Sequence, residues 1–268
     1  MPSFCLYLYI QNINIVMDQT QVASKSNIPT EQIELPSRGL VYSKENPLSS
    51  GVIEMKYMTA KEEDILTNRN FINNGTVIDK LLQSLIISKI NYNDLVVGDK
   101  NAILVAARIL GYGADYTFSY NGEEVTVDLS TLEEKKFDES HLLAPNTNEF
   151  KFKLPHTNNE VTFKLLTHKD EQDIDRELEA LRKLTPQGSF DNTTRLKYMI
   201  TSVNGDRDRN VIKDFIDNQF IARDSRAFKK HVGSVMPDVK LEFTYEGNGR
   251  VEEGVTIPVG VSFFWPDA

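Results

Sequence analysis

The sequence predicts an α+β fold, and three kinds of pattern indicate it. Residues 53–57 (IEMKY) alternate apolar and charged side chains, which is typical of a half-buried strand. The apolar side chains of residues 77–86 recur every three or four positions, which indicates an amphipathic helix. Asn121-Gly122 suits the positive φ angles of a type I′ turn and predicts a β-hairpin. Because hairpins are interspersed with helices, an α+β class is favoured over a purely parallel sheet.

The first half is expected to contain strands, three helices and a hairpin. The strands are predicted at 33–42, interrupted by Pro36 and a turn, and at 53–57. The helices are predicted after Thr59, at 77–86 and at 102–110, with the region from Gly111 to Gly113 as the stop of the third, and the hairpin follows at 116–129.

The second half is expected to repeat this content. Two strands are predicted at 150–155 and 161–166, then helices at 169–184, 193–203, 209–218 and 224–234, and a long hairpin at 241–261.

The two halves also resemble each other, which indicates an internal duplication. Residues 53–63 (IEMKYMTAKEE) align without a gap to residues 161–171 (VTFKLLTHKDE), and the hairpin segment 118–122 aligns to 243–247. The separation between matched residues grows from 108 to 130 along the chain, as insertions in the second copy would produce. The alternative is that two α+β segments share only their capping and turn chemistry.

The chain is therefore predicted to divide into three parts. They are an upstream extension with a disordered polar tail (1–32), a first repeat ending in hairpin 116–129 (33–145) and a second repeat ending in hairpin 241–261 (146–268). An isolated hairpin is marginally stable at best. We therefore expect the two hairpins to pack around a pseudo-twofold axis and the repeats to form one compact unit.

The amino-terminal residues are expected to lie outside this unit. The stretch that begins at Met17 is polar and has a disordered composition. We expect Met17 to be the biological start, and residues 1–16 to be an extension of the reading frame. A start at Met1, with an edge strand or a partner-binding segment, is the alternative. The apolar run 4–10 is too short to span a bilayer, and Cys5 lies within it.

Composition and motifs exclude several classes of function. The chain has 268 residues, 30 Lys and Arg, 39 Asp and Glu and a net charge of −9, which argues against nucleic-acid binding. Its single cysteine excludes a disulfide framework within the chain. Phosphate-binding loops, HExxH and GxSxG are absent from the sequence, and its four histidines have no metal-ligand spacing.

Two acidic clusters remain as candidates for chemistry, Glu62-Glu63-Asp64 and Asp170-Glu171-Asp173. Carboxylates in such clusters could act as an acid and a base or hold a divalent metal ion. Both clusters, however, lie in the first turn of a predicted helix, where carboxylates bind the free amides. We therefore interpret Thr59 with Glu62, and Thr167 with Asp170, as helix caps.

The end of the sequence contains three consecutive aromatic residues, Phe263, Phe264 and Trp265. They are candidates either for core packing beneath the second hairpin or for an anchor that binds a partner. Core packing is the favoured interpretation.

Seven segments carry a resemblance to a known family. They are LPSRGLVY (35–42), MTAKEEDILTNRN (58–70), NGTVIDKLL (74–82), VGDKNAILVAARILGYGADY (97–116), TTRLKYMI (193–200), ARDSRAFKKH (222–231) and PVGVSFFWPDA (258–268). The chain resembles, over residues 33–268, the T4-type bacteriophage baseplate family, the hub assembly proteins of contractile-tailed phages. The resemblance implies a small tail protein that is needed to build the central hub and has no known catalytic activity.

One departure from that family concerns the hairpins. Many members carry a CxxC pair in each terminal hairpin, and the two pairs together would suit a four-cysteine zinc site. Here the corresponding positions read SYNG (119–122) and TYEG (244–247). A zinc site is therefore expected to be lost, and no cofactor is expected. We hypothesise that Tyr120 and Tyr245 instead pack the two hairpins together.

The expected function is that of a non-enzymatic phage tail protein, a component or assembly factor of the baseplate hub. It would contact other hub and tail proteins and neither nucleic acid nor membrane. The resemblance implies a place in the host cytoplasm during assembly and, for a component, in the tail baseplate of the virion. One alternative is a chaperone of hub subunits that the mature virion lacks. Another is a carboxylate- or metal-dependent hydrolase that uses the acidic clusters.

Overall fold

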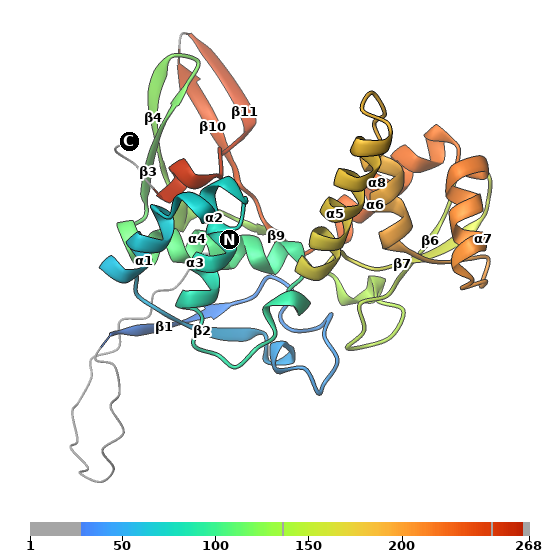
Figure 1. The fold of residues 1–268 in the computed structure, drawn as a ribbon, viewed down its shortest axis with the longest axis horizontal. Helices are drawn as coiled ribbons and strands as arrows, with labels where there is room; N and C mark the ends of the chain where they lie inside the picture. The colour runs from blue at the N-terminus through green and yellow to red at the C-terminus, as the bar shows by residue number, and fades with distance from the viewer. Residues whose placement is uncertain (1–27, 136, 248, 265–268) are drawn as a thin grey trace.

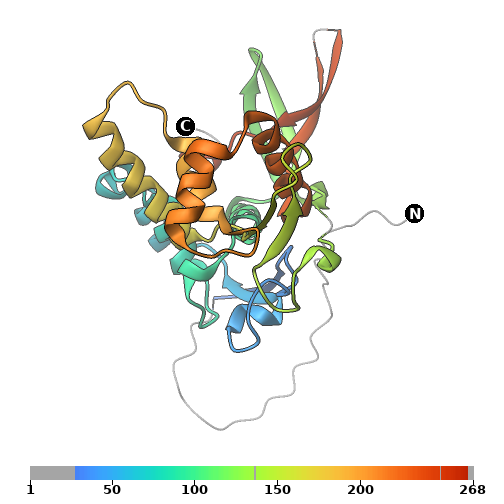
Figure 2. The same ribbon diagram turned by 90° about the vertical axis from the view of Figure 1, so that its right-hand side faces the viewer.

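The computed structural model describes residues 28–135, 137–247 and 249–264, and it has the predicted α+β class (Figure 1). The ribbon has two lobes, and both terminal hairpins rise above the lobe that the first half of the chain forms (Figures 1 and 2). Among the described residues, no helix combines the length and the apolar character that crossing a membrane requires.

The first lobe opens with two antiparallel strands and continues with four helices. Ile53 and Met55 are at most 1% exposed while Glu54 between them is exposed, as the alternation predicts. Helix α3 buries the predicted apolar stripe. The elements are β1 (Thr30–Glu34), β2 (Val52–Lys56), α1 (Ala60–Leu66), α2 (Arg69–Asn73), α3 (Val77–Leu85) and α4 (Val97–Tyr112).

The second lobe contains a three-stranded antiparallel sheet with β7 at its centre. The first two strands form a hairpin, and the third arrives after two helices. The elements are β6 (Phe150–Lys153), β7 (Glu160–Phe163), α5 (His168–Leu184), α6 (Asp191–Met199), β8 (Ile200–Val203), α7 (Arg209–Asp214), a π-helical turn (Phe215–Gln219) and α8 (Ala222–Val235).

The chain then returns to the first lobe. Strand β9 (Asp238–Val239) pairs with β5 (Glu134–Lys135) and packs against α4. Gly98 of α4 permits this approach, because a Cβ atom there would overlap the carbonyl oxygen of Pro237. The two hairpins are β3 (Asp115–Tyr120) with β4 (Glu123–Asp128) and β10 (Glu242–Gly247) with β11 (Arg250–Thr256).

Several contacts recur in the two lobes. In each, the leucine of a Leu-Pro pair donates its N–H across the strand pair, and the residue after a nine-residue helix pairs with the second strand. The matching contacts are Leu35 to the Gly51 carbonyl (2.8 Å), Leu154 to the Asn159 carbonyl (2.8 Å), Met55 opposite Ile86 and Phe163 opposite Ile200. These parallels support the duplication hypothesis, which stays a prediction.

The prediction of one helix over 193–203 is wrong. Helix α6 ends at Met199, and residues 200–203 form β8, in which Ile200 lies opposite Phe163. The apolar residues of this segment fit a helical stripe and a strand face equally well. β-Branched side chains favour the strand, and the backbone of β7 provides its partner.

Three predicted boundaries also differ. Strand β1 starts at Thr30, inside the predicted disordered tail, because its polar residues pair with β2, and it ends at Glu34, so residues 36–42 form turns and a bend and not the predicted continuation of the strand. Helix α4 starts at Val97, five residues before the predicted start, and its N-cap is Val96, which has no polar side chain to mark it. The second hairpin ends at Thr256. Met1, Cys5 and Met17 lie outside the described residues.

The core is shared. Buried apolar side chains of both lobes form one contiguous cluster, from Leu35 to Phe264, and a small second cluster lies beneath α5. This continuity agrees with one compact unit rather than two free domains.

Candidate interaction site at the paired hairpins

The two hairpins face each other through aromatic side chains. Alternate residues of a strand point to one face, which places Phe118 and Tyr120 together on β3. Across the interface, the ring centroid of Phe118 lies 5.4 Å from that of Phe243, and the centroids of Tyr120 and Tyr245 are 5.0 Å apart. Both pairs meet edge to face, the arrangement that the aromatic quadrupole favours. The structure thus places the two tyrosines in contact, as the hypothesis expected.

The hydroxyl groups of these tyrosines bind carboxylates of the opposite hairpin. Tyr120 donates to Glu252 Oε2 (3.2 Å), and Tyr245 donates to Glu123 Oε2 (2.6 Å). Each hairpin therefore supplies one donor and one acceptor, which is the reciprocity that a pseudo-twofold contact requires. Desolvation and the Glu252 carboxylate raise the pKa of Tyr120, so its hydroxyl keeps the proton that it donates.

The described part of the chain contains no group of three or more His, Cys, Asp or Glu side chains placed to hold a metal ion. Residues 119–122 and 244–247 of the two hairpins include no cysteine. The contact between the hairpins instead uses aromatic packing and two hydrogen bonds.

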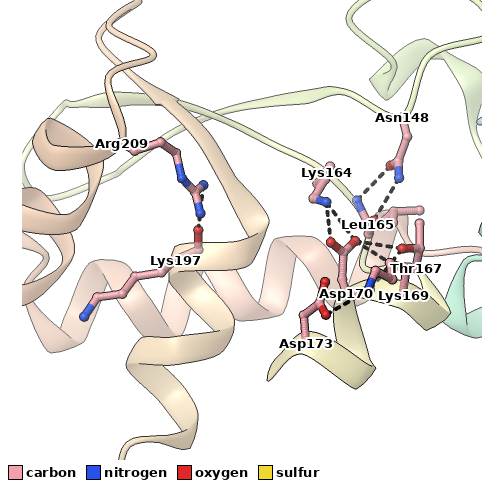
Figure 3. Close-up of polar contacts among 9 residues, drawn as sticks. All are labelled: Asn148, Lys164, Leu165, Thr167, Lys169, Asp170, Asp173, Lys197 and Arg209. Carbon is pink, nitrogen blue, oxygen red and sulfur yellow. Dashed lines mark hydrogen bonds and ion pairs between the residues drawn. The ribbon is translucent and has the colours of Figure 1, made fainter. Parts of the chain in front are cut away.

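The predicted cap of α5 is present, and Figure 3 shows its bonds. The Asp170 carboxylate accepts from the Thr167 N–H (3.0 Å) and from the Thr167 hydroxyl (2.9 Å). Lys164 binds the same carboxylate at 2.6 Å. The link between β7 and α5 is fixed in turn by Asn148, whose side-chain amide exchanges two 2.8 Å hydrogen bonds with the backbone of Leu165. These bonds tie the end of β7 to the first turn of α5.

Helix α1 begins in the same way. The Glu62 carboxylate accepts from the Thr59 N–H (3.0 Å) and hydroxyl (2.6 Å) and pairs with Lys56 at 2.7 Å. Burial alone would raise the pKa of Glu62, but the bonds from Lys56 and Thr59 outweigh it and hold the pKa below its usual value. The lysine therefore completes an arrangement that local capping rules predict only in part.

Two buried aspartates, absent from the sequence-predicted site residues, hold the start of α4 and of α8. Asp99 accepts from the Ser37 N–H (2.9 Å) and hydroxyl (2.6 Å), and Asp224 accepts from the Thr157 N–H (3.0 Å) and hydroxyl (2.7 Å). Both are 0% exposed. The signal that could have found them is their alignment in the two halves, each with a donor that closely follows a Leu-Pro pair.

A cluster of polar side chains that was not predicted from the sequence lies where the two lobes meet. Lys100 pairs with Asp79 at 2.6 Å, Tyr92 donates to the same carboxylate at 3.0 Å, and Lys100 Nζ lies 3.3 Å from His168 Nδ1. Burial, and then the Lys100 charge, lower the pKa of His168. Because His168 is only 3% exposed, this group joins α3 and α4 to α5 rather than facing a substrate.

The closing aromatic residues belong to the core as far as the structure describes them. Phe263 and Phe264 are both 0% exposed, and the ring centroid of Phe263 lies 4.8 Å from that of Tyr116 at the base of the first hairpin. They are core residues and are not free to anchor a partner. Trp265 lies outside the described residues.

A groove lies in the second lobe, between α5, α6 and α7, and has a volume of about 520 Å³. It is open, and Arg209 at its edge donates to the Lys197 carbonyl oxygen (3.1 Å, Figure 3). The capping carboxylates Glu62 and Asp170 do not line it.

Comparisons of the chain with protein-family models, with curated proteins and with solved structures find no match.

Proposed function

We propose that this chain is a non-enzymatic phage tail protein that acts through protein–protein contacts, as a component or assembly factor of the central baseplate hub. It would work in the host cytoplasm during assembly, with other hub and tail proteins as partners. The proposal rests on the resemblance of seven segments, which are spread over residues 33–268. That span covers both lobes and both hairpins.

One structural observation carries the non-enzymatic part of the proposal. The Glu62 and Asp170 carboxylates, which a hydrolase would use, are each bound by a lysine and by a threonine at the start of a helix. A carboxylate held in this way is committed to the fold. The hairpins, by contrast, project from the body and present their outer faces to solvent (Figure 1).

Co-expression with the neighbouring tail genes, followed by affinity capture of this chain, tests the proposal. We expect a hub or tail protein to be captured in a fixed ratio. The substitution Tyr245→Ala loosens the contact between the hairpins, and capture should weaken in this variant, whereas the exposed Thr244→Ala is the matched control and should leave capture unchanged. Capture of no tail protein in any pairing contradicts the proposal.

Mass spectrometry of purified virions separates the component from the chaperone. A stoichiometric amount of the chain in intact particles supports a component of the hub. Its absence from particles, together with capture of hub subunits from the cell, supports an assembly factor. Cryo-EM of the assembled baseplate would then identify the surface used.

The hydrolase alternative is tested by Glu62→Gln and Asp170→Asn. If the carboxylates only cap helices, both substitutions lower the midpoint of thermal unfolding. An enzyme would instead lose a measurable hydrolytic activity at an unchanged midpoint, which would overturn the non-enzymatic proposal.

A further inference from the structure

The acidic charge of the molecule is concentrated on the paired hairpins. Residues 115–128 contain four carboxylates and no Lys or Arg, and residues 242–256 contain four carboxylates and one arginine. The hairpins therefore carry −7 of the formal net charge of −9. None of these eight carboxylates forms an ion pair with a residue that the structure describes. The pair of hairpins is an uncompensated acidic projection.

Helix α8 presents the opposite charge. Arg223, Arg226, Lys229 and Lys230 are exposed, and in the described part of the chain none of them has an ion-pair or hydrogen-bond partner. The opposite face of the helix is buried in the core through Phe228. Residues three and four apart share one face of a helix, so these cations form a stripe along the outside of α8. The one acidic residue of α8, Asp224, points inward and is bonded, so it does not neutralise the stripe.

A groove runs beside this stripe. It has a volume of about 400 Å³, and Leu196, Ile216 and Phe220 contribute apolar surface while Arg226 and Lys229 line its edge. The projecting hairpins have a matching apolar residue, because Val251 of β11 is 69% exposed, next to Glu252 and Arg250 and opposite Glu246 of β10. Apolar surface edged by cations fits an exposed valine on a hairpin whose net charge is negative.

The two surfaces cannot meet within one molecule. The hairpins rise above the first lobe, whereas α8 belongs to the second (Figures 1 and 2), and no ion pair joins them among the described residues. We propose that the paired hairpins of one copy dock on the α8 stripe and groove of a second copy. Such a head-to-tail contact joins two different surfaces, so it generates a ring or a filament rather than a closed dimer. This inference does not depend on the proposed function.

Sedimentation velocity of the full chain over a range of concentrations tests it. We expect self-association at low salt that weakens as salt is added, since exposed charges are screened. Two reversed variants locate the contact. The hairpin variant carries Glu124→Lys, Glu246→Lys and Glu253→Lys, and the α8 variant carries Arg223→Glu, Arg226→Glu and Lys230→Glu. All six residues are exposed.

Each reversed variant alone should lose at least about tenfold in its association constant. The hairpin variant changes the charge of the hairpins from −7 to about −1, and the α8 variant changes its stripe from +4 to about −2, so each loses the attraction between the two surfaces. An equal mixture of the two should associate again, since the unchanged hairpins of the α8 variant can dock on the unchanged α8 stripe of the hairpin variant. A control with Lys80→Glu, Lys89→Glu and Lys183→Glu changes the same charge at exposed sites away from α8 and should associate more than the α8 variant. Circular dichroism of every variant checks that the fold is kept.

The inference is overturned if the wild-type chain stays monomeric at low salt, or if it associates but neither reversed variant weakens the association. It is also overturned if the mixture of folded variants stays monomeric. Binding of a DNA duplex to α8 by a monomeric wild-type chain would assign the stripe to a different partner and would overturn it as well.

Discussion

The two lobes anchor their last helix with the same device but place it in different surroundings. Asp99 and Asp224 each occupy the third position of a helix, and each reaches a segment that follows a Leu-Pro pair. In the first lobe the loop 36–51 also brings the hydroxyl of Tyr42 onto Asp99 (2.5 Å). In the second lobe the shorter loop 155–159 supplies only backbone groups and the Thr157 hydroxyl.

This difference reverses the effect of the fold on the two carboxylates. Burial raises the pKa of Asp99 despite its bonds from Ser37 and Tyr42, and the nearby Asp238 charge adds to the rise. Burial also acts on Asp224, but the bonds from Thr157 and from the His156 N–H outweigh it and lower the pKa. The position of each aspartate in its helix therefore provides the anchor, while the loop around the carboxylate decides whether its charged form is favoured.

Removing the two anchors should show this difference most strongly. We expect Asp99→Ala to lower the free energy of unfolding by about 3–5 kcal/mol, because it leaves three buried donors without an acceptor. Asp224→Ala should cost about 2–3 kcal/mol, since the loop 155–159 lies nearer to solvent and water can replace the lost bonds. Urea denaturation measures both. The exposed Asp64→Ala serves as the control, and equal losses at the two anchors would contradict the comparison.

The hairpins allow a second comparison, since Tyr245 is 4% exposed and Tyr120 is only half-buried. Tyr245→Ala should cost about 2–4 kcal/mol and Tyr120→Ala about 1–2 kcal/mol, following the area that each loses. In a double-mutant cycle the two should couple by about 0.5–1.5 kcal/mol. Thr244→Ala, on the outer face, is the matched control. Unchanged stability in both tyrosine variants, or stoichiometric zinc in the purified protein, would refute the packing role.

Much of the fold follows from short-range signals. The first hairpin was predictable because Asn121-Gly122 and the alternating strands are adjacent in sequence. The caps were predictable because Thr and its acidic partner are three residues apart. The strand at 200–203 was missed because its partner β7 lies 37–42 residues earlier, and its own pattern also fits a helix.

The candidate site was predictable only in part for the same reason. Tyr120 and Tyr245 could be paired because the two halves align, so a comparison of distant segments was possible. The Asp99 anchor joins residues 62 positions apart, and the junction of Lys100 with His168 joins residues 68 apart. No local pattern marks such contacts, and they depend on how the lobes pack.

Substitutions in the two capping boxes should differ by a smaller amount in the free energy of unfolding that they cost. The Glu62 side chain is 1% exposed and that of Asp170 is 12% exposed, so the first is more fully desolvated. We expect Glu62→Gln to cost about 2 kcal/mol and Asp170→Asn about 1 kcal/mol, because each amide keeps the shape but loses the charge that binds lysine. Thermal unfolding measures the ranking. Combining each change with Lys56→Met or Lys164→Met should show that the lysine accounts for part of the loss, and full additivity would contradict this.

The smallest expected effect is a difference in how acid loosens the two anchors. The pKa of Asp224 is lowered by folding, so its contribution to stability is present above the ordinary pKa and is lost as pH falls through the folded value. The pKa of Asp99 is raised, so the part of its contribution that depends on protonation is present below the ordinary pKa and is lost as pH rises through the folded value. Acidification below about pH 4 should therefore weaken the second anchor while the first is retained.

Hydrogen exchange at the donor amides reports each anchor directly, because Ser37 donates to Asp99 whereas His156 and Thr157 donate to Asp224. After correction for intrinsic rates, exchange at His156 and Thr157 should rise a few-fold before exchange at Ser37 does. In Asp224→Asn that rise should disappear, since the amide side chain does not titrate, and earlier exchange at Ser37 would show that the surroundings of the two anchors have been assigned the wrong way round.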